Sequence, residues 1–138
     1  MATRDVFHDA VKHGLQKDGW TITDDPLHIR MQGIQMYIDL GAEKVIGAER
    51  AGQKIAVEVK SFLGPSAISE FHAALGQYLN YQQALEEQDP ERELYLAVPQ
   101  DTYNDFFKLP FVQGTVRRHD LKLIVYEPET EVLVIWKD

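Results

Sequence analysis

The sequence predicts one α/β domain that spans residues 1–138, with a mixed central sheet flanked by helices. The expected order is helix, three strands, helix, strand, and an extra C-terminal β-hairpin closes the chain. Two observations carry this prediction. A long amphipathic pattern leads into residues 94–98, LYLAV, which are continuously apolar and typical of a central strand paired in parallel after a helical crossover. Two earlier β-patterned runs are joined by Ala51-Gly52, which is typical of a hairpin turn.

The first part of the chain predicts a helix followed by extended structure. Residues 2–16 predict the helix, because apolar side chains recur every four positions at Phe7, Val11 and Leu15. Residues 20–30 then alternate in polarity as strands do, with an interruption at an Asp-Asp-Pro sequence.

The hairpin is predicted from residues 43–50 and 53–62. A two-residue loop pairs Val45 with Glu58 and Glu43 with Lys60, and cross-strand partners share a face of the sheet. Glu43, Glu58 and Lys60 are therefore expected on one face at one end of the hairpin. A three-residue loop would instead turn Glu43 to the opposite face.

The triplet Glu58-Val59-Lys60 closes the second run of the hairpin, and its pattern is typical of a metal-binding or catalytic site. Alternate side chains of a strand point to the same side, so the acid and the ammonium group point together. The acid can hold a divalent metal, and the lysine can orient a water molecule or stabilise charge on a phosphate. The preceding stretch offers Asp39 and Glu43 as further carboxylates, whereas Glu49 is expected to be exposed at the turn.

The same residues also fit a structural interpretation. Antiparallel hairpins often carry one solvated face of acidic and basic side chains that form cross-strand ion pairs. Spacing alone leaves both interpretations open.

The second half of the chain predicts the longest helix over residues 67–87, with Ile68, Phe71 and Leu75 packed on the sheet. After the apolar strand, a short helix is predicted near residues 101–109. The final apolar runs are expected to pair as strands, and they comprise residues 121–126 and 132–136.

Composition excludes several classes of protein. The chain has no cysteine, which excludes disulfides, thiolate zinc sites and cysteine nucleophiles. The sequence has no signal-like segment and no run of about 18 apolar residues, so a cytoplasmic protein without a membrane span is expected. A net charge of −8 argues against a general nucleic-acid binder, but it leaves room for a local basic patch or a more basic partner.

The order of elements, with Asp39 ahead of Glu58-x-Lys60, resembles the PD-(D/E)XK nuclease superfamily and its restriction endonuclease-like core (αβββαβ). Ile38 stands where the superfamily name has Pro. Nearly the whole chain resembles the XisH family, the cyanobacterial fdxN element excision controlling factors. The segments that carry this resemblance are RDVFHDAVKHGL, DPLHI, DLGAEKVIGAERAGQKIAVEVKSFLGPS, ALGQYLNY, LYLAVP and LKLIVYEPE.

The resemblance implies a set of site residues. Asp39, Glu58, Lys60 and Gln77 would be catalytic, and Mg²⁺ or Mn²⁺ would be held by Asp39, Glu43, Glu58 and the carbonyl of Val59. Lys60 would orient the attacking water. Gln77 belongs to a Gln-x-x-x-Tyr sequence that some superfamily members have on the following helix, and residues four apart share a helix face.

Two functions follow from the resemblance. One is a DNA-processing factor that controls programmed excision of a DNA element and acts as a metal-dependent endonuclease. It would work with DNA, a companion excision-control protein and a site-specific recombinase, and a homodimer is a further expectation. The other is a non-cleaving regulatory subunit that keeps the nuclease fold and acts through partner proteins.

Overall fold

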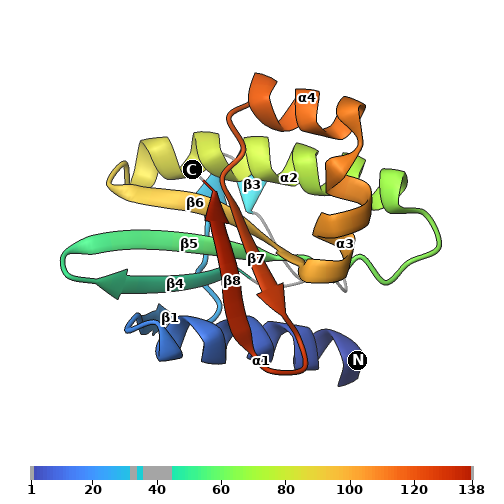
Figure 1. The fold of residues 1–138 in the computed structure, drawn as a ribbon. Coiled ribbons are helices and arrows are strands. Elements are labelled where there is room, and N and C mark those ends of the chain that lie inside the picture. The colour runs from blue at the N-terminus through green and yellow to red at the C-terminus, as the bar shows by residue number, and fades with distance from the viewer. Residues whose placement is uncertain (1, 32–33, 36–44, 138) are drawn as a thin grey trace.

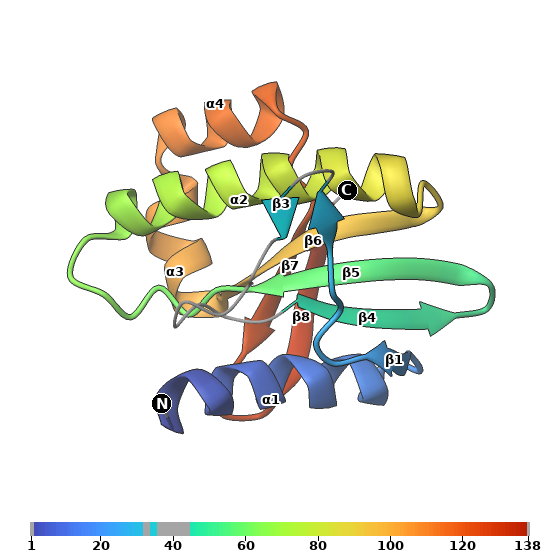
Figure 2. The same ribbon diagram turned by 180° about the vertical axis from the view of Figure 1, so that it is seen from behind.

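The computed structural model describes residues 2–31, 34–35 and 45–137, and it shows a mixed α/β fold (Figures 1 and 2). Its main sheet has six strands in the order β1-β4-β5-β6-β7-β8, and β2 and β3 form a separate two-stranded ladder. The elements in chain order are α1 (Ala2–Lys17), β1 (Thr21–Asp24), β2 (Arg30–Met31), β3 (Ile34–Gln35), β4 (Val45–Arg50), β5 (Gln53–Val59), α2 (Ala67–Gln88), β6 (Arg92–Pro99), α3 (Gln100–Asp105), η1 (Phe106–Lys108), α4 (Pro110–Arg118), β7 (Leu123–Glu127) and β8 (Val132–Lys137).

Helices cover both faces of the main sheet. Figure 1 shows α1 on one side of the sheet and α2, α3 and α4 on the other. Alternate residues of β5 follow this division: Ile55 and Val57 pack in the cluster that contains α1, and Ala56 packs in the cluster that contains α2. Because both faces are covered, residues 55–59 are all buried, which explains their nearly continuous apolar sequence.

The predicted hairpin is confirmed in type and register. Ala51 and Gly52 both have positive φ, at 51° and 83°, which are the conformations that a two-residue hairpin turn requires. The register pairs Arg50 with Gln53 and Val45 with Glu58. Beyond the hairpin, β6 pairs with β5 in parallel, as the long apolar run predicted.

The buried Tyr78 ties α2 to the sheet. Its hydroxyl donates to the carbonyl of Leu94 at 3.0 Å and accepts from the N–H of Lys122 at 3.2 Å. Burial raises the pKa of Tyr78 to about 12, so the hydroxyl keeps the proton that it donates.

The C-terminal third departs from the sequence prediction in its helices. The sequence predicted a single short helix near residues 101–109. This segment instead forms α3 and η1, and a further helix, α4, begins with Pro110. Proline in the first turn loses no helical hydrogen bond, so Pro110 can begin the helix. The predicted C-terminal hairpin is present, and it continues the main sheet because β7 pairs with β6 in parallel.

One predicted packing contact is wrong. Phe71 is buried and Leu75 packs against the same core, but Ile68 is 40% exposed. Ile68 lies in the first turn of α2, before the part of the helix that reaches the sheet.

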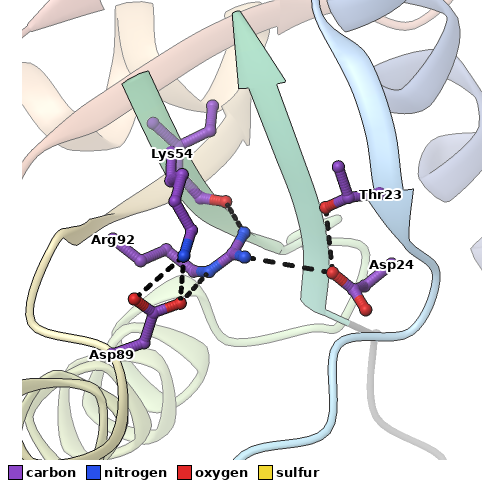
Figure 3. A network of polar contacts seen from close by, with 6 residues as sticks. Thr23, Asp24, Lys54, Asp89 and Arg92 are labelled. Carbon is purple, nitrogen blue, oxygen red and sulfur yellow. Dashed lines mark hydrogen bonds and ion pairs between the residues drawn. The ribbon is translucent and has the colours of Figure 1, made fainter. Parts of the chain in front are cut away.

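At the end of α2, Arg92 joins several elements (Figure 3). Its guanidinium donates to the carbonyl of Ile55 at 2.8 Å and to the carboxylate of Asp89 at 3.1 Å. Lys54 lies 3.0 Å from the same carboxylate, and Asp24 lies 4.0 Å from the guanidinium. A Cβ at Gly47 would come within 3.0 Å of the side-chain ends of both Asp24 and Arg92, so a larger residue there would have to displace one of them.

We predict that Asp89→Asn lowers the free energy of unfolding near neutral pH by about 1 to 3 kcal/mol, because the buried guanidinium loses its negatively charged acceptor and keeps only the carbonyl of Ile55. The hydrogen bond from Lys54, together with Arg92, holds the pKa of Asp89 below its ordinary value of 3.8. A depressed folded-state pKa gives stability that is present above the unfolded pKa and lost as pH falls through the folded pKa.

Urea unfolding near pH 7 and near pH 3 tests this prediction. The difference between wild type and Asp89→Asn should narrow at the acidic pH. The exposed Glu91, changed to Gln, is the control. A gap of equal size at both pH values would contradict the assignment.

Candidate functional site

Glu58 and Lys60 lie together on the face of the sheet that α2 covers. Glu58 is 1% exposed, and its Oε2 atom lies 3.6 Å from the Nζ atom of Lys60, whose side chain is 12% exposed. The register of the hairpin and the alternation along β5 place both side chains on this face. A solvated hairpin face, the structural interpretation that the sequence left open, does not fit a carboxylate so deeply buried.

Helix α2 supplies the next residue of the site. The ammonium group of Lys60 donates to Oε1 of Gln77 at 2.5 Å. Tyr81, four residues further along the helix, is buried, and burial together with the negative charge of Glu58 raises the pKa of Tyr81 to about 12. Gln77 and Tyr81 therefore both lie on the side of α2 that approaches the Glu58–Lys60 pair, as their spacing predicted.

The backbone of Lys60 is fixed by two neighbouring strands. Its N–H donates to the carbonyl of Ala97 in β6 at 3.0 Å. Its carbonyl accepts from the hydroxyl of Tyr126 in β7 at 2.9 Å. Tyr126 is fully buried, and the ring of Phe7 packs edge-on against it with 6.1 Å between centroids. Sequence reasoning missed Tyr126, because nothing in a local pattern links it to a residue so far away in the chain.

The remaining predicted ligands divide into two groups. Asp39 and Glu43 lie outside the described residues. The side chain of Val59 points away from Glu58 into the core beside α1, which leaves its main-chain carbonyl as the only group it can offer a metal. Within residues 2–31, 34–35 and 45–137, no group of three or more His, Cys, Asp or Glu side chains is placed to hold a metal.

The donor chemistry of the described residues fits Mg²⁺ or Mn²⁺ in type. Glu58 is a buried carboxylate, and the chain has no thiolate that would favour a softer metal. Glu58 alone is one ligand, so a metal here depends on Asp39 or Glu43. Glu49 is exposed near the turn end of the hairpin, as expected.

The opposite face of the sheet carries a separate polar cluster. His8 and Lys12 of α1 contact the carboxylate of Asp25 at 2.7 and 2.9 Å. Burial alone would raise the pKa of Asp25, but the hydrogen bonds and positive charge of Lys12 and His8 outweigh it and the pKa is lowered. This cluster joins α1 to the segment after β1 and has no contact with Gln77 or Lys60 among the interactions described.

The fold and site together define a mixed α/β protein in which a buried acid lies beside a partly buried ammonium group under a helix. A family model described as XisH protein matches residues 1–134, and the chain belongs to the XisH family. No curated protein matches the chain. Among the described residues, no helix has both the length and the apolar character needed to cross a membrane.

Two solved structures are similar over nearly the whole chain. A crystal structure of an XisH family protein from Nostoc punctiforme PCC 73102 is 52% identical, with a TM-score of 0.90, and the match covers 97% of this chain and 100% of that chain. A crystal structure of a fdxN element excision controlling factor protein from Anabaena variabilis is 53% identical, also with a TM-score of 0.90, and the match covers 97% and 99%.

We predict that Tyr126→Phe lowers the free energy of unfolding by about 1 kcal/mol, because the carbonyl of Lys60 loses a buried hydrogen bond. Tyr103→Phe is the matched control, since Tyr103 is also buried but its hydroxyl makes no hydrogen bond to the residues described. Urea unfolding of the two variants measures the difference. Equal losses would show that the Tyr126 hydroxyl contributes nothing to holding Lys60.

Proposed function

We propose that this chain takes part in controlling the excision of a DNA element and acts as a metal-dependent endonuclease. Membership of the XisH family supports the first part, because a 53% identical protein is described as a fdxN element excision controlling factor. One observation carries the second part: Glu58 is buried, with Lys60 and Gln77 arranged around it by β5 and α2.

The burial of charge supports a functional site at this position. A carboxylate in the protein interior loses its hydration, and a nearby ammonium group offsets that loss only in part. A core built for stability alone would favour an apolar residue at position 58, between Ala56 and the end of the strand. Buried ionisable groups with a specific charged neighbour are characteristic of functional sites.

Each residue has a proposed role. Glu58, Asp39 and Glu43, with the carbonyl of Val59, would hold Mg²⁺ or Mn²⁺, which when bound would stabilise negative charge on a DNA phosphate. Lys60 would orient the attacking water. Gln77 would act as a positioning residue, because it fixes the ammonium group of Lys60. DNA, a companion excision-control protein and a site-specific recombinase are the proposed partners, in the cytoplasm, with the chain as a homodimer.

A second function is favoured by the net charge of −8. A surface with this excess of acid repels the DNA backbone. The chain would then be a non-cleaving regulatory subunit that keeps the site but acts through partner proteins.

We predict that Mg²⁺ or Mn²⁺ raises the melting temperature of the wild type, because carboxylates brought together repel one another until a cation binds. At a metal concentration 100 times Kd, the gain in free energy of unfolding should be about 2.7 kcal/mol. Glu58→Gln should lose most of this gain, and Glu49→Gln, in the same hairpin but near its turn, should keep it. Calorimetry with no binding at millimolar metal would favour the regulatory subunit.

We predict that Lys60→Ala slows cleavage by at least about 100-fold, as expected when the group that positions water is lost, while metal binding persists. The exposed Lys137, changed to Ala, should cleave as the wild type does. Linear, nicked and branched DNA with Mg²⁺ or Mn²⁺, with and without excision partners, are the substrates. A wild type that cleaves none of them under any of these conditions would overturn the endonuclease proposal.

A further inference from the structure

A hollow of about 760 Å³ lies beside the site, at the carboxyl ends of β5 and β6. It begins at Ser61, which directly follows Lys60, and it extends past Pro99 to the turn between β7 and β8. Its volume lies within the range of sites that bind ligands or short peptide segments. A ligand or peptide segment bound in this hollow would therefore lie next to Lys60 in the chain.

The hollow combines apolar and acidic lining. Phe7, Phe62 and Leu63 give it apolar surface, and Leu63 is 56% exposed, so an incoming side chain can reach it. The acidic side chains of the lining are Asp101, Glu127, Glu129 and Glu131. No Lys or Arg is among the described residues that line it.

Two of the four carboxylates are already engaged. Glu127 accepts from the N–H of Glu129 at 2.9 Å, and Glu131 lies 3.0 Å from the ring of His13. Asp101 and Glu129 have no cationic partner among the residues that the structure describes. These two carboxylates are therefore available to a cation from outside.

The lining excludes other occupants on charge and geometry. A DNA backbone would bring phosphates against four carboxylates. The four acids are not gathered closely enough to hold a metal ion, since no such group is found among the described residues. A small apolar molecule would leave the carboxylates beside it without compensation. An occupant with positive charge and an apolar contact surface fits both halves of the lining.

We propose that this hollow is the docking site for a basic segment of a partner protein, in which Lys or Arg side chains pair with Asp101 and Glu129 and an aliphatic or aromatic side chain packs on Leu63 and Phe62. The partner would then bind at the point where the chain leaves Lys60. The proposal is independent of metal binding and of cleavage at Glu58.

The test uses the full chain without metal and two capped hexapeptides, Lys-Arg-Leu-Leu-Lys-Arg and Lys-Arg-Ser-Ser-Lys-Arg. Amide NMR titration should show that the first peptide shifts signals at residues 61–63, 101–102 and 127–131. The second peptide should bind more weakly, because it lacks the apolar anchor. Spermidine and a short DNA duplex are titrated in parallel.

Matched variants distinguish the effect of carboxylates in the hollow from the effect of the net charge of the chain. Asp101→Asn with Glu129→Gln should weaken binding of the first peptide about tenfold, as expected for two exposed ion pairs. Glu87→Gln with Glu91→Gln makes the same change in net charge at exposed positions near the end of α2, and should weaken it by no more than about twofold. Leu63→Ser should weaken it, whereas Phe111→Ser, at another exposed apolar residue, should not.

The outcomes decide the proposal. The proposal is supported if the Asp101→Asn, Glu129→Gln variant and the Leu63→Ser variant bind the first peptide more weakly while both control variants bind it as the wild type does. The proposal is overturned if both double charge variants lose binding equally, if the two peptides bind alike, or if spermidine binds as strongly. It is also overturned if DNA shifts the signals of these residues, or if no peptide binds at millimolar concentration. None of these outcomes depends on whether Glu58 binds a metal.

Discussion

The two-residue turn between β4 and β5 determines which face of the sheet carries charge. Ala51 and Gly52 both adopt left-handed backbone conformations, and the resulting register pairs Val45 with Glu58. A slip of one residue would turn Glu58 toward α1, among the apolar side chains of that core. It would also turn valine toward α2, where Gln77 and Tyr81 lie. The position of the site under α2 thus depends on backbone geometry at the far end of the hairpin.

The two ends of β5 and β6 differ in how their charged side chains affect the stability of the fold. At their beginning, Arg92 connects α2, β5 and β1 through hydrogen bonds and ion pairs that stabilise the fold. At their end, Glu58 and Lys60 bring charge into the interior, where its desolvation costs stability. Between them, the apolar residues of both strands form the core.

Local patterns predicted most of the fold but only part of the site. The hairpin register follows from the loop length, and the parallel pairing of β6 follows from its continuously apolar run after a helix. The resemblance to nucleases implied that Gln77 approaches Lys60. The helix α4 was not predicted from the sequence, and Ile68 was misplaced because periodicity does not tell where a helix meets the sheet. The contribution of Tyr126 depends on tertiary structure, since it joins strands that are distant in the sequence. Asp39 and Glu43 lie outside the described residues, so their part in the site stays a prediction.

The hydrogen bond between Tyr126 and Lys60 spans 66 positions in the chain. A ribosome adds residues at roughly 5–20 per second, so Lys60 is synthesised several seconds before Tyr126. During that interval, the emerging polypeptide already contains Glu58, Lys60 and Gln77 but lacks the strand that holds the Lys60 carbonyl. The Lys60 carbonyl is therefore held by β7 only after the other described residues of the site have been synthesised.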